Sequence, residues 1–166
     1  MPTTISEPRD LLVTALTEML YVERKLADEV LPELKSEIKT PEFKQGVDRH
    51  LRETMHHAEN LERAFELLGE QPKADKSQSL DGLVAQRGKV IKQIKSDHLR
   101  ELFNAGAAAK TEHLEIAAYE SMITTAETLG QSELVELLEE NLADEKDTLK
   151  EVEKVAQTLS KETTTA

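Results

Sequence analysis

The sequence has 166 residues, of which 33% are charged and 3% aromatic, with no cysteine and a formal net charge of −12. This length suits one domain with its own core, so we expect residues 1–166 to form a single domain. The absence of cysteine excludes disulfide bonds, thiolate metal sites and thiol nucleophiles. The acidic charge disfavours nucleic acid as a partner, because phosphate binding needs clustered lysine and arginine.

Caps and helix breakers predict four long helices. The first starts after Ser6 and runs to about residue 39, with Pro32 inside it as the expected site of a kink. The second starts with Thr40 as N-cap and Pro41 in the first helical position. It is expected to end at Gly69, because glycine is the usual residue just past a helix end.

The second half of the chain repeats this pattern after a polar connection. A short helix is expected at about residues 80–95, within the connection. The third long helix starts near Ser96 or Asp97 and stops at Gly130, and Ser132 is expected to cap the fourth, which runs to about residue 160. The core then covers about residues 7–160, and residues 161–166 form a frayed tail.

The lengths of the connections predict the topology. The short turns at 39–41 and 130–132 make two antiparallel helical hairpins, and the segment 70–95 is long enough to carry the chain back along the bundle. Two hairpins joined by a long crossover are typical of a ferritin-like four-helix bundle. The sequence therefore predicts an all-α protein of this class, with a short extra helix in the crossover.

Neither a membrane nor a secretory pathway is indicated. No apolar run approaches the roughly 20 residues that span a bilayer. The N-terminal stretch "MPTTISEPRD" lacks the basic and apolar segments of a signal peptide. We expect a cytoplasmic protein with no membrane partner.

Each long helix carries glutamates on or beside its apolar stripe when its side chains are placed at roughly 100° per residue. These are Glu23, Glu53, Glu112, Glu115 and Glu145. Each lies between 13 and 18 residues from the turn of its own hairpin. At about 1.5 Å per residue this is roughly 20–27 Å, so all four helices can place a carboxylate in one layer near mid-bundle.

The histidines of the second helix differ in their predicted direction. His50 and His57 flank the apolar face on one side, and Glu53 sits between them, further round the helix. His56 points nearly the opposite way, although it is next to His57 in sequence. We therefore expect His57, and not His56, to face the carboxylate layer.

A layer of buried carboxylates needs an explanation. A single glutamate can extend to solvent or pair with lysine, but several unpaired buried carboxylates cost several kcal/mol each. No lysine or arginine occupies the matching inward positions. Two bound divalent cations would offset the charge, and oxygen-rich sites with one or two imidazoles suit iron or manganese.

The sequence also resembles a known family, the YciE/YciF family of bacterial ferritin-like stress proteins, over nearly its whole length. The resemblance rests on "YVERKLADEVLPEL", "HLRETMHHAENLERAFELLGEQP", "KTEHLEIAAYESM" and "LLEENLADEKDTL". It implies a four-helix core with extra helical elements, a homodimer, a role in stress responses and a di-metal carboxylate site, commonly assumed to hold iron. It implies five carboxylate ligands, namely Glu23, Glu53, Glu112, Glu115 and Glu145.

The chain departs from ferritins and bacterioferritins, which usually pair an inward glutamate with a histidine three residues later. That spacing selects His56 after Glu53, yet His56 points outward, and it selects Thr148 after Glu145. We therefore predict a carboxylate-rich site with His57 as its imidazole ligand. Residues expected beside the ligands are His50, which makes a second imidazole if it reaches in, and Tyr119, Asn141 and Asp144.

Three functions compete at this point. The leading hypothesis is a di-iron or di-manganese protein that handles oxygen, peroxide or the metal itself. The alternative is a non-catalytic dimeric scaffold with a vestigial or structural metal site. A DNA-protecting shell fits less well, because the chain is acidic and has no basic tail.

Overall fold

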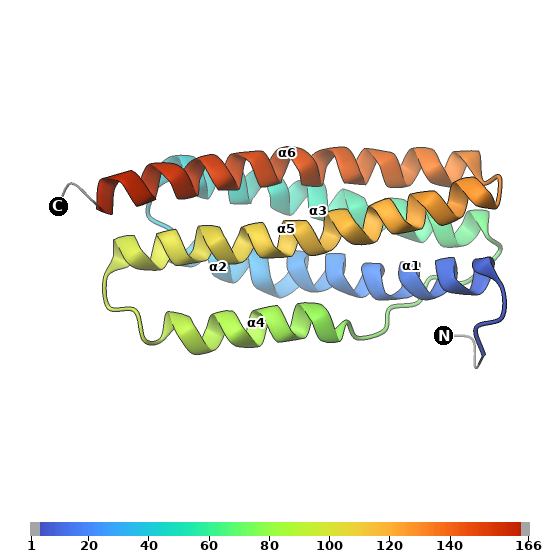
Figure 1. The fold of residues 1–166 in the computed structure, drawn as a ribbon, viewed down its shortest axis with the longest axis horizontal. Coiled ribbons are helices and arrows are strands. Elements are labelled where there is room, and N and C mark those ends of the chain that lie inside the picture. The colour runs from blue at the N-terminus through green and yellow to red at the C-terminus, as the bar shows by residue number, and fades with distance from the viewer. Residues whose placement is uncertain (1–3, 164–166) are drawn as a thin grey trace.

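The computed structural model describes residues 4–163, and all regular structure in that range is helical (Figure 1). The all-α prediction is therefore confirmed. The elements in chain order are α1 (Pro8–Lys25), η1 (Leu26–Val30), α2 (Leu31–Glu37), α3 (Pro41–Leu67), α4 (Gln78–Ile91), α5 (Asp97–Thr128) and α6 (Ser132–Thr163). Four long helical rods lie side by side, and α4 runs along the outside of the bundle (Figure 1).

The first rod consists of α1, η1 and α2. Its irregularity is a five-residue π-helix, Leu26–Val30, which ends two residues before Pro32. Proline has no amide hydrogen and its ring clashes with the preceding turn, so an α-helix cannot pass through it unchanged. The wider π turn accommodates this proline, and such turns are frequent at functional sites.

Two glycines end the helices that precede the connections. Gly69 and Gly130 have φ angles of 71° and 68°, in the left-handed region that residues with a Cβ rarely adopt. After Gly130, the amide of Gln131 donates to the carbonyl of Ala126 at 3.0 Å, which closes the end of α5. Both predicted helix stops are therefore confirmed.

The second helix of each hairpin begins at a residue whose capping differs from expectation. Thr40 occupies the N-cap position of α3, but its hydroxyl makes no bond to its own helix. It donates to the buried carboxylate of Glu101 in α5, which also accepts from the amides of Lys39 and Thr40. Ser132 is the first residue of α6 and not its cap.

Helix α4 covers one side of the bundle in the crossover. It spans Gln78–Ile91 and so starts two residues earlier and ends four residues earlier than predicted. Asp81 joins it to α1, accepting from the Tyr21 hydroxyl at 2.8 Å and pairing with the Lys25 ammonium at 2.5 Å. Arg87 joins it to α2 and α5 through Glu33, Glu37 and Asn104.

The interior has apolar regions at both ends and a polar layer between them. Leu12, Leu16 and Leu20 are fully buried toward one end, and Leu34 and Phe43 toward the other. Four buried glutamates, Glu23, Glu112, Glu115 and Glu145, and the two buried histidines lie between these regions. Helix α6 continues through residue 163, so residues 161–163, expected as part of a frayed tail, are helical. The rest of that predicted tail, 164–166, lies outside the described residues.

Candidate metal centre

Four glutamates and two histidines meet in the middle of the bundle. Each is at most 3% exposed, and they come from four different rods: Glu23 from α1, His50 and His57 from α3, Glu112 and Glu115 from α5, and Glu145 from α6. They form two groups whose potential ligand atoms lie within 4.8 Å of one another.

The first group, the Glu23 group, consists of Glu23, His57 and Glu145. The Nδ1 atom of His57 lies 2.9 Å from Oε1 of Glu145 and 3.7 Å from Oε1 of Glu23. On the other side of the ring, Nε2 lies 3.3 Å from Oδ2 of Asp144. A carboxylate on the outer nitrogen fixes the orientation of an imidazole whose inner nitrogen binds a metal.

A hydrogen-bonded chain supports the Glu23 group. The Tyr119 hydroxyl donates to Oε1 of Glu23, and Asn141 donates to the Tyr119 oxygen at 3.0 Å. Asn60 in turn donates to the side-chain oxygen of Asn141 at 2.8 Å. Burial and the neighbouring Glu23 raise the pKa of Tyr119 well above its ordinary value, so its hydroxyl keeps its proton.

The second group, the His50 group, consists of His50, Glu112, Glu115 and Glu145. The Nε2 atom of His50 lies 3.4 Å from Oε1 of Glu112 and 3.9 Å from Oε2 of Glu145. Its other nitrogen, Nδ1, lies 3.3 Å from the Thr148 hydroxyl and 3.8 Å from Oε2 of Glu53. His50 is thus oriented from outside, as His57 is.

Glu145 belongs to both groups. Its Oε1 atom faces His57, and its Oε2 atom faces His50. A carboxylate with one oxygen toward each group is suited to bridge two cations.

Many atoms of this layer have no hydrogen-bond partner. Among the described residues, the buried side-chain atoms of this kind are Glu23 Oε2, His50 Nε2, His57 Nδ1, Glu112 Oε2, both carboxylate oxygens of Glu115 and both of Glu145. Buried polar atoms in proteins are nearly always hydrogen-bonded, and an unmet ion is one of the few explanations when they are not. All eight atoms belong to the two groups, so the donors fit metal ions.

Burial and mutual repulsion change the pKa values of the carboxyl groups in the layer. Burial, increased by repulsion from Glu145, raises the pKa of Glu115 well above its ordinary value. Burial and the charge of Glu145 likewise raise the pKa of Glu112, against the opposing effect of His50. The pKa of Glu23 is raised for similar reasons. Burial acts in the same direction on Glu145, but His57 and His50 outweigh it and lower its pKa.

The histidines compensate for these carboxylates when no metal is bound. Burial acts to lower the pKa of His50, but Glu112, Glu53 and Glu145 outweigh it and raise the value to about 9. Burial is likewise outweighed at His57, where Glu145 and Glu23 raise the pKa to about 11. Both imidazoles are therefore cationic near neutral pH and must lose a proton before they can bind a metal.

The structure places the expected residues with two differences, at Glu53 and His50. Glu23, His57, Glu112, Glu115 and Glu145 lie in the two groups, and His56 points outward, 49% exposed and 3.1 Å from Glu140. Glu53 is in neither group, because its side chain is 25% exposed and lies beside Arg49 and the outer nitrogen of His50. His50, expected beside the ligands, is in a group. Ligation by Glu53 stays a prediction that would require its side chain to turn inward.

Sequence reasoning missed two supporting residues. Thr148 orients His50, and Asn60 extends the chain behind Tyr119. A signal for Thr148 was available, since it lies three residues after Glu145 on the same face of α6.

The donors define the chemical class of the site. Buried imidazole nitrogens and carboxylate oxygens, without sulfur, could hold a metal ion. Glutamates and histidines that project into a four-helix bundle are typical of ferritin-like proteins. The chain belongs to the family described as "Domain of unknown function (DUF892)", which it matches over residues 7–165.

Similar proteins agree with the family assignment. The chain is 29% identical over 140 residues to Protein YciF of Escherichia coli strain K12, a match that covers 84% of each chain. The crystal structure of the E. coli stress protein YciF superposes with a TM-score of 0.89 at 26% identity, over 95% of this chain and 99% of that one. YcfI from Rhodopseudomonas palustris gives a TM-score of 0.88 at 28% identity, over 92% and 97%.

These matches confirm the predicted family and helical-bundle fold. Within residues 4–163, no helix combines the length and apolar character needed to cross a membrane.

Proposed function

We propose that this protein binds two divalent cations, iron first and manganese as the alternative, and that it uses them to react with oxygen or peroxide or to hold the metal itself. The observation that carries the proposal is the convergence of eight buried side-chain atoms without hydrogen-bond partners in one layer. An apolar protein interior does not keep such atoms without compensation.

Charge supports a pair of ions. The two groups contain four different carboxylates, and the buried polar residues within 4–163 include no lysine or arginine to neutralise them. Without metal, protonated His50 and His57 offset only part of this charge, and both must give up their protons when a metal binds. Two divalent cations supply the four positive charges that four ionised carboxylates need. One ion would be held by Glu23, His57 and Glu145, and the other by His50, Glu112, Glu115 and Glu145.

The chain's own residues prepare this layer for ions. When bound, a pair of redox-active ions supplies electrons in steps of two to oxygen or peroxide. Asp144 orients the imidazole of His57, and Thr148 orients that of His50. The Tyr119 hydroxyl holds one oxygen of Glu23, which leaves the other free for a cation.

The relatives support a wider setting for this chemistry. YciF of E. coli is named a stress protein, and we extend that role to this chain. A homodimer is the assembly that we propose, and light scattering on the purified protein would measure its mass in solution.

Metal content tests the proposal against a non-catalytic scaffold. The protein is purified without added metal, loaded under argon with ferrous or, in a parallel sample, manganous ions, and desalted. Its metal content is then measured by inductively coupled plasma mass spectrometry. We expect about two ions per chain. A folded protein, verified by circular dichroism, that retains no ferrous or manganous ion would contradict the proposal and favour the scaffold.

A further inference from the structure

A cavity lies under the crossover helix and reaches the His50 group. Its volume is about 90 Å³, and its walls come from η1, α2, α4 and α5. Apolar side chains dominate it: Leu26 and Leu31 from the first rod, Val84 from α4, and Phe103 and Ala107 from α5. The π-helix contributes Leu26 to the wall.

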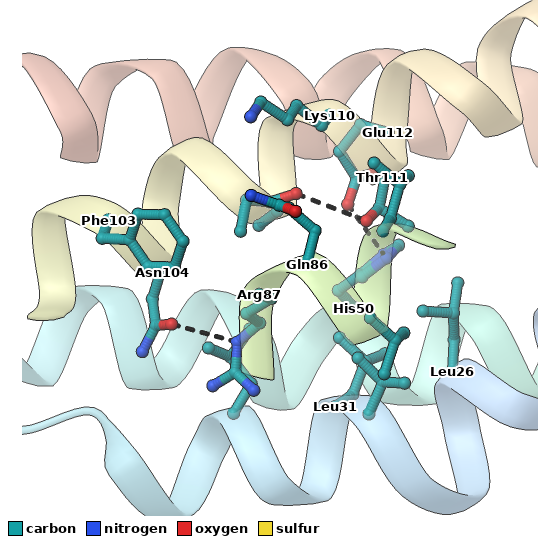
Figure 2. A pocket seen from close by; sticks show the side chains of 16 residues that line it. Leu26, Leu31, His50, Gln86, Arg87, Phe103, Asn104, Lys110, Thr111 and Glu112 are labelled. Atoms are coloured by element: carbon teal, nitrogen blue, oxygen red, sulfur yellow. Dashed lines mark hydrogen bonds and ion pairs between the residues drawn. The ribbon is translucent and has the colours of Figure 1, made fainter. Parts of the chain in front are cut away.

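The inner end of the cavity is formed by His50 and Glu112, which point toward one another in Figure 2. His50 Nε2 and Glu112 Oε2 are among the atoms without hydrogen-bond partners. A second cavity of about 40 Å³, lined by Phe43 and Val47, reaches the same two residues from the α3 side. Neither cavity is lined by Glu23 or His57, so both lead to one end of the centre.

The outer end of the larger cavity carries polar side chains. Arg87 of α4 is 10% exposed and lies beside Asn104, to which its Nε atom donates at 3.0 Å (Figure 2). It also pairs with Glu33 and Glu37 of α2. These bonds fasten α4 over the cavity, and they occupy the guanidinium, so Arg87 is not free to bind a charged guest.

Size and lining restrict what the cavity can hold. Ligand pockets for larger organic molecules are roughly 300–1,000 Å³, and this cavity is far smaller. An apolar cavity of about 150 Å³ binds benzene or xenon and excludes water. Gln86, Lys110 and Thr111 also line the cavity, but most of its exposed lining is apolar. Along the apolar part of the wall, a charged or strongly polar guest would lose its hydration without gaining partners. The cavity therefore fits a small, uncharged, apolar molecule.

We propose that the cavity under α4 is the pocket and access route by which dioxygen, a small apolar molecule, reaches the His50 group. This inference rests on the proposed function, because it assigns the non-metal substrate of the same centre. It makes Ala107 and Val84 wall residues whose size controls access. The Glu23 group takes no part in access.

Xenon tests the pocket without any metal. Crystals of the metal-free protein are pressurised with xenon, and its position is located by anomalous scattering. We expect xenon in the cavity of the unmodified protein and none in Ala107→Leu, whose side chain fills it. Ala118→Leu is the matched control, because Ala118 is on α5, partly buried, and lines neither cavity. Val84→Phe narrows the pocket from α4 and replaces Ala107→Leu if that variant fails to fold.

Oxidation of bound ferrous ions by dissolved dioxygen tests the route. In this assay two ferrous ions each give one electron, and dioxygen takes both with two protons to form hydrogen peroxide. We expect the oxidation rate to fall about tenfold or more in Ala107→Leu, with unchanged ferrous stoichiometry and an unchanged rate in Ala118→Leu.

The xenon and oxidation experiments distinguish failure of the dioxygen route from failure of the proposed metal binding. Absence of xenon from the cavity, or an unchanged oxidation rate in a variant that excludes xenon, would overturn the inference. Absence of ferrous binding in the unmodified protein would overturn the proposed function, and the dioxygen route with it, whatever the xenon result. If Ala107→Leu slows oxidation by hydrogen peroxide but not by dioxygen, the assigned guest is wrong.

Discussion

The two ends of the centre share Glu145 but differ in their surroundings. At the Glu23 end, Tyr119 holds Glu23, Asp144 orients His57, and neither cavity reaches the ligands. At the His50 end, both oxygens of Glu115 lack partners, and two cavities reach His50 and Glu112. At the Glu23 end, a hydrogen bond holds one carboxylate and neither cavity reaches the ligands; at the His50 end, Glu115 has no hydrogen-bond partner and two cavities reach the buried ligands.

This difference indicates how one layer can combine retention with reactivity. A carboxylate fixed by a hydrogen bond loses less rotamer freedom when a cation binds, so binding is favoured by preorganisation. A carboxylate without partners can turn to make room for a substrate. We therefore assign firm metal holding to the Glu23 end and substrate contact to the His50 end.

The largest effect is expected from the carboxylate that both ends share. Glu145→Gln should weaken binding of both cations by roughly 100-fold or more, because changes to residues that only orient ligands already cost about 10–100-fold. Glu23→Ala and Glu112→Ala should each remove most of the metal from their own end. Titration calorimetry under argon measures these affinities, with Glu139→Gln on the exposed face of α6 as control. Equal affinities in Glu145→Gln and unmodified protein would refute the bridging role.

The metal-free protein should become less stable as the pH rises from 6 to 9. The raised pKa values of His50, about 9, and His57, about 11, add stability that is complete below about 6.5 and is lost as the pH rises through those values. The raised pKa values of Glu112 and Glu115 act in the same direction, starting from about 4.5. We expect a lower melting temperature at pH 9 than at pH 6.

Metal should reverse this trend, because its binding requires deprotonated ligands and grows stronger with pH. A cation at 100 times its dissociation constant stabilises the folded state by about 2.7 kcal/mol. Chelation should therefore lower the melting temperature more at pH 8 than at pH 6. Calorimetric melting of both forms across this range measures the gap. If the difference in melting temperature between the two forms narrows as the pH rises, metal binding does not displace protons from the histidines.

A smaller effect separates two histidines that are adjacent in sequence. His57→Ala should weaken metal binding at the Glu23 end by about 10–100-fold, because His57 is buried within the layer. His56→Ala should leave it nearly unchanged, because His56 is exposed beside Glu140 and Glu59. Cobalt absorption spectra of the two variants provide the measurement. A changed spectrum in His56→Ala alone would show that the phase of α3 is wrong.

The smallest expected effect is at the residue that orients His50. Thr148→Val keeps the shape of the side chain and removes its hydroxyl, so it should weaken binding at the His50 end a few-fold, since Glu53 still faces the same nitrogen. Thr125→Val removes a hydroxyl that bonds only within α5, and it should leave binding unchanged. Affinities from the same calorimetry decide the matter, and no difference between the two variants would assign the orientation of His50 to Glu53 alone.

Much of this arrangement could be predicted because helix periodicity and turn positions are strong signals. Glu23 and Glu145 interrupt otherwise regular apolar stripes, and their similar distances from the turns place them in one layer. His57 was separated from His56 by roughly 100° of helix rotation, a difference too large for packing to reverse.

The relation between His50 and Glu53 could not be predicted in the same way. They differ by only roughly 60° around α3, so the choice of the inward residue depends on what α6 presents. Thr148 presents a hydroxyl to His50, and the longer side chain of Glu53 reaches toward Arg49. The π-helix at 26–30 and the cavity beside it also escaped prediction. One widened turn barely alters an apolar pattern, and the packing of α4 is a tertiary property.

The most direct test of the central claim is anomalous diffraction from crystals soaked with manganous ions, recorded on both sides of the manganese absorption edge. We expect two peaks per chain inside the bundle, one beside Glu23 and His57 and one beside His50, Glu112 and Glu115, with Glu145 between them. Peaks confined to surface carboxylates, with an interior free of manganese, would contradict a two-ion centre.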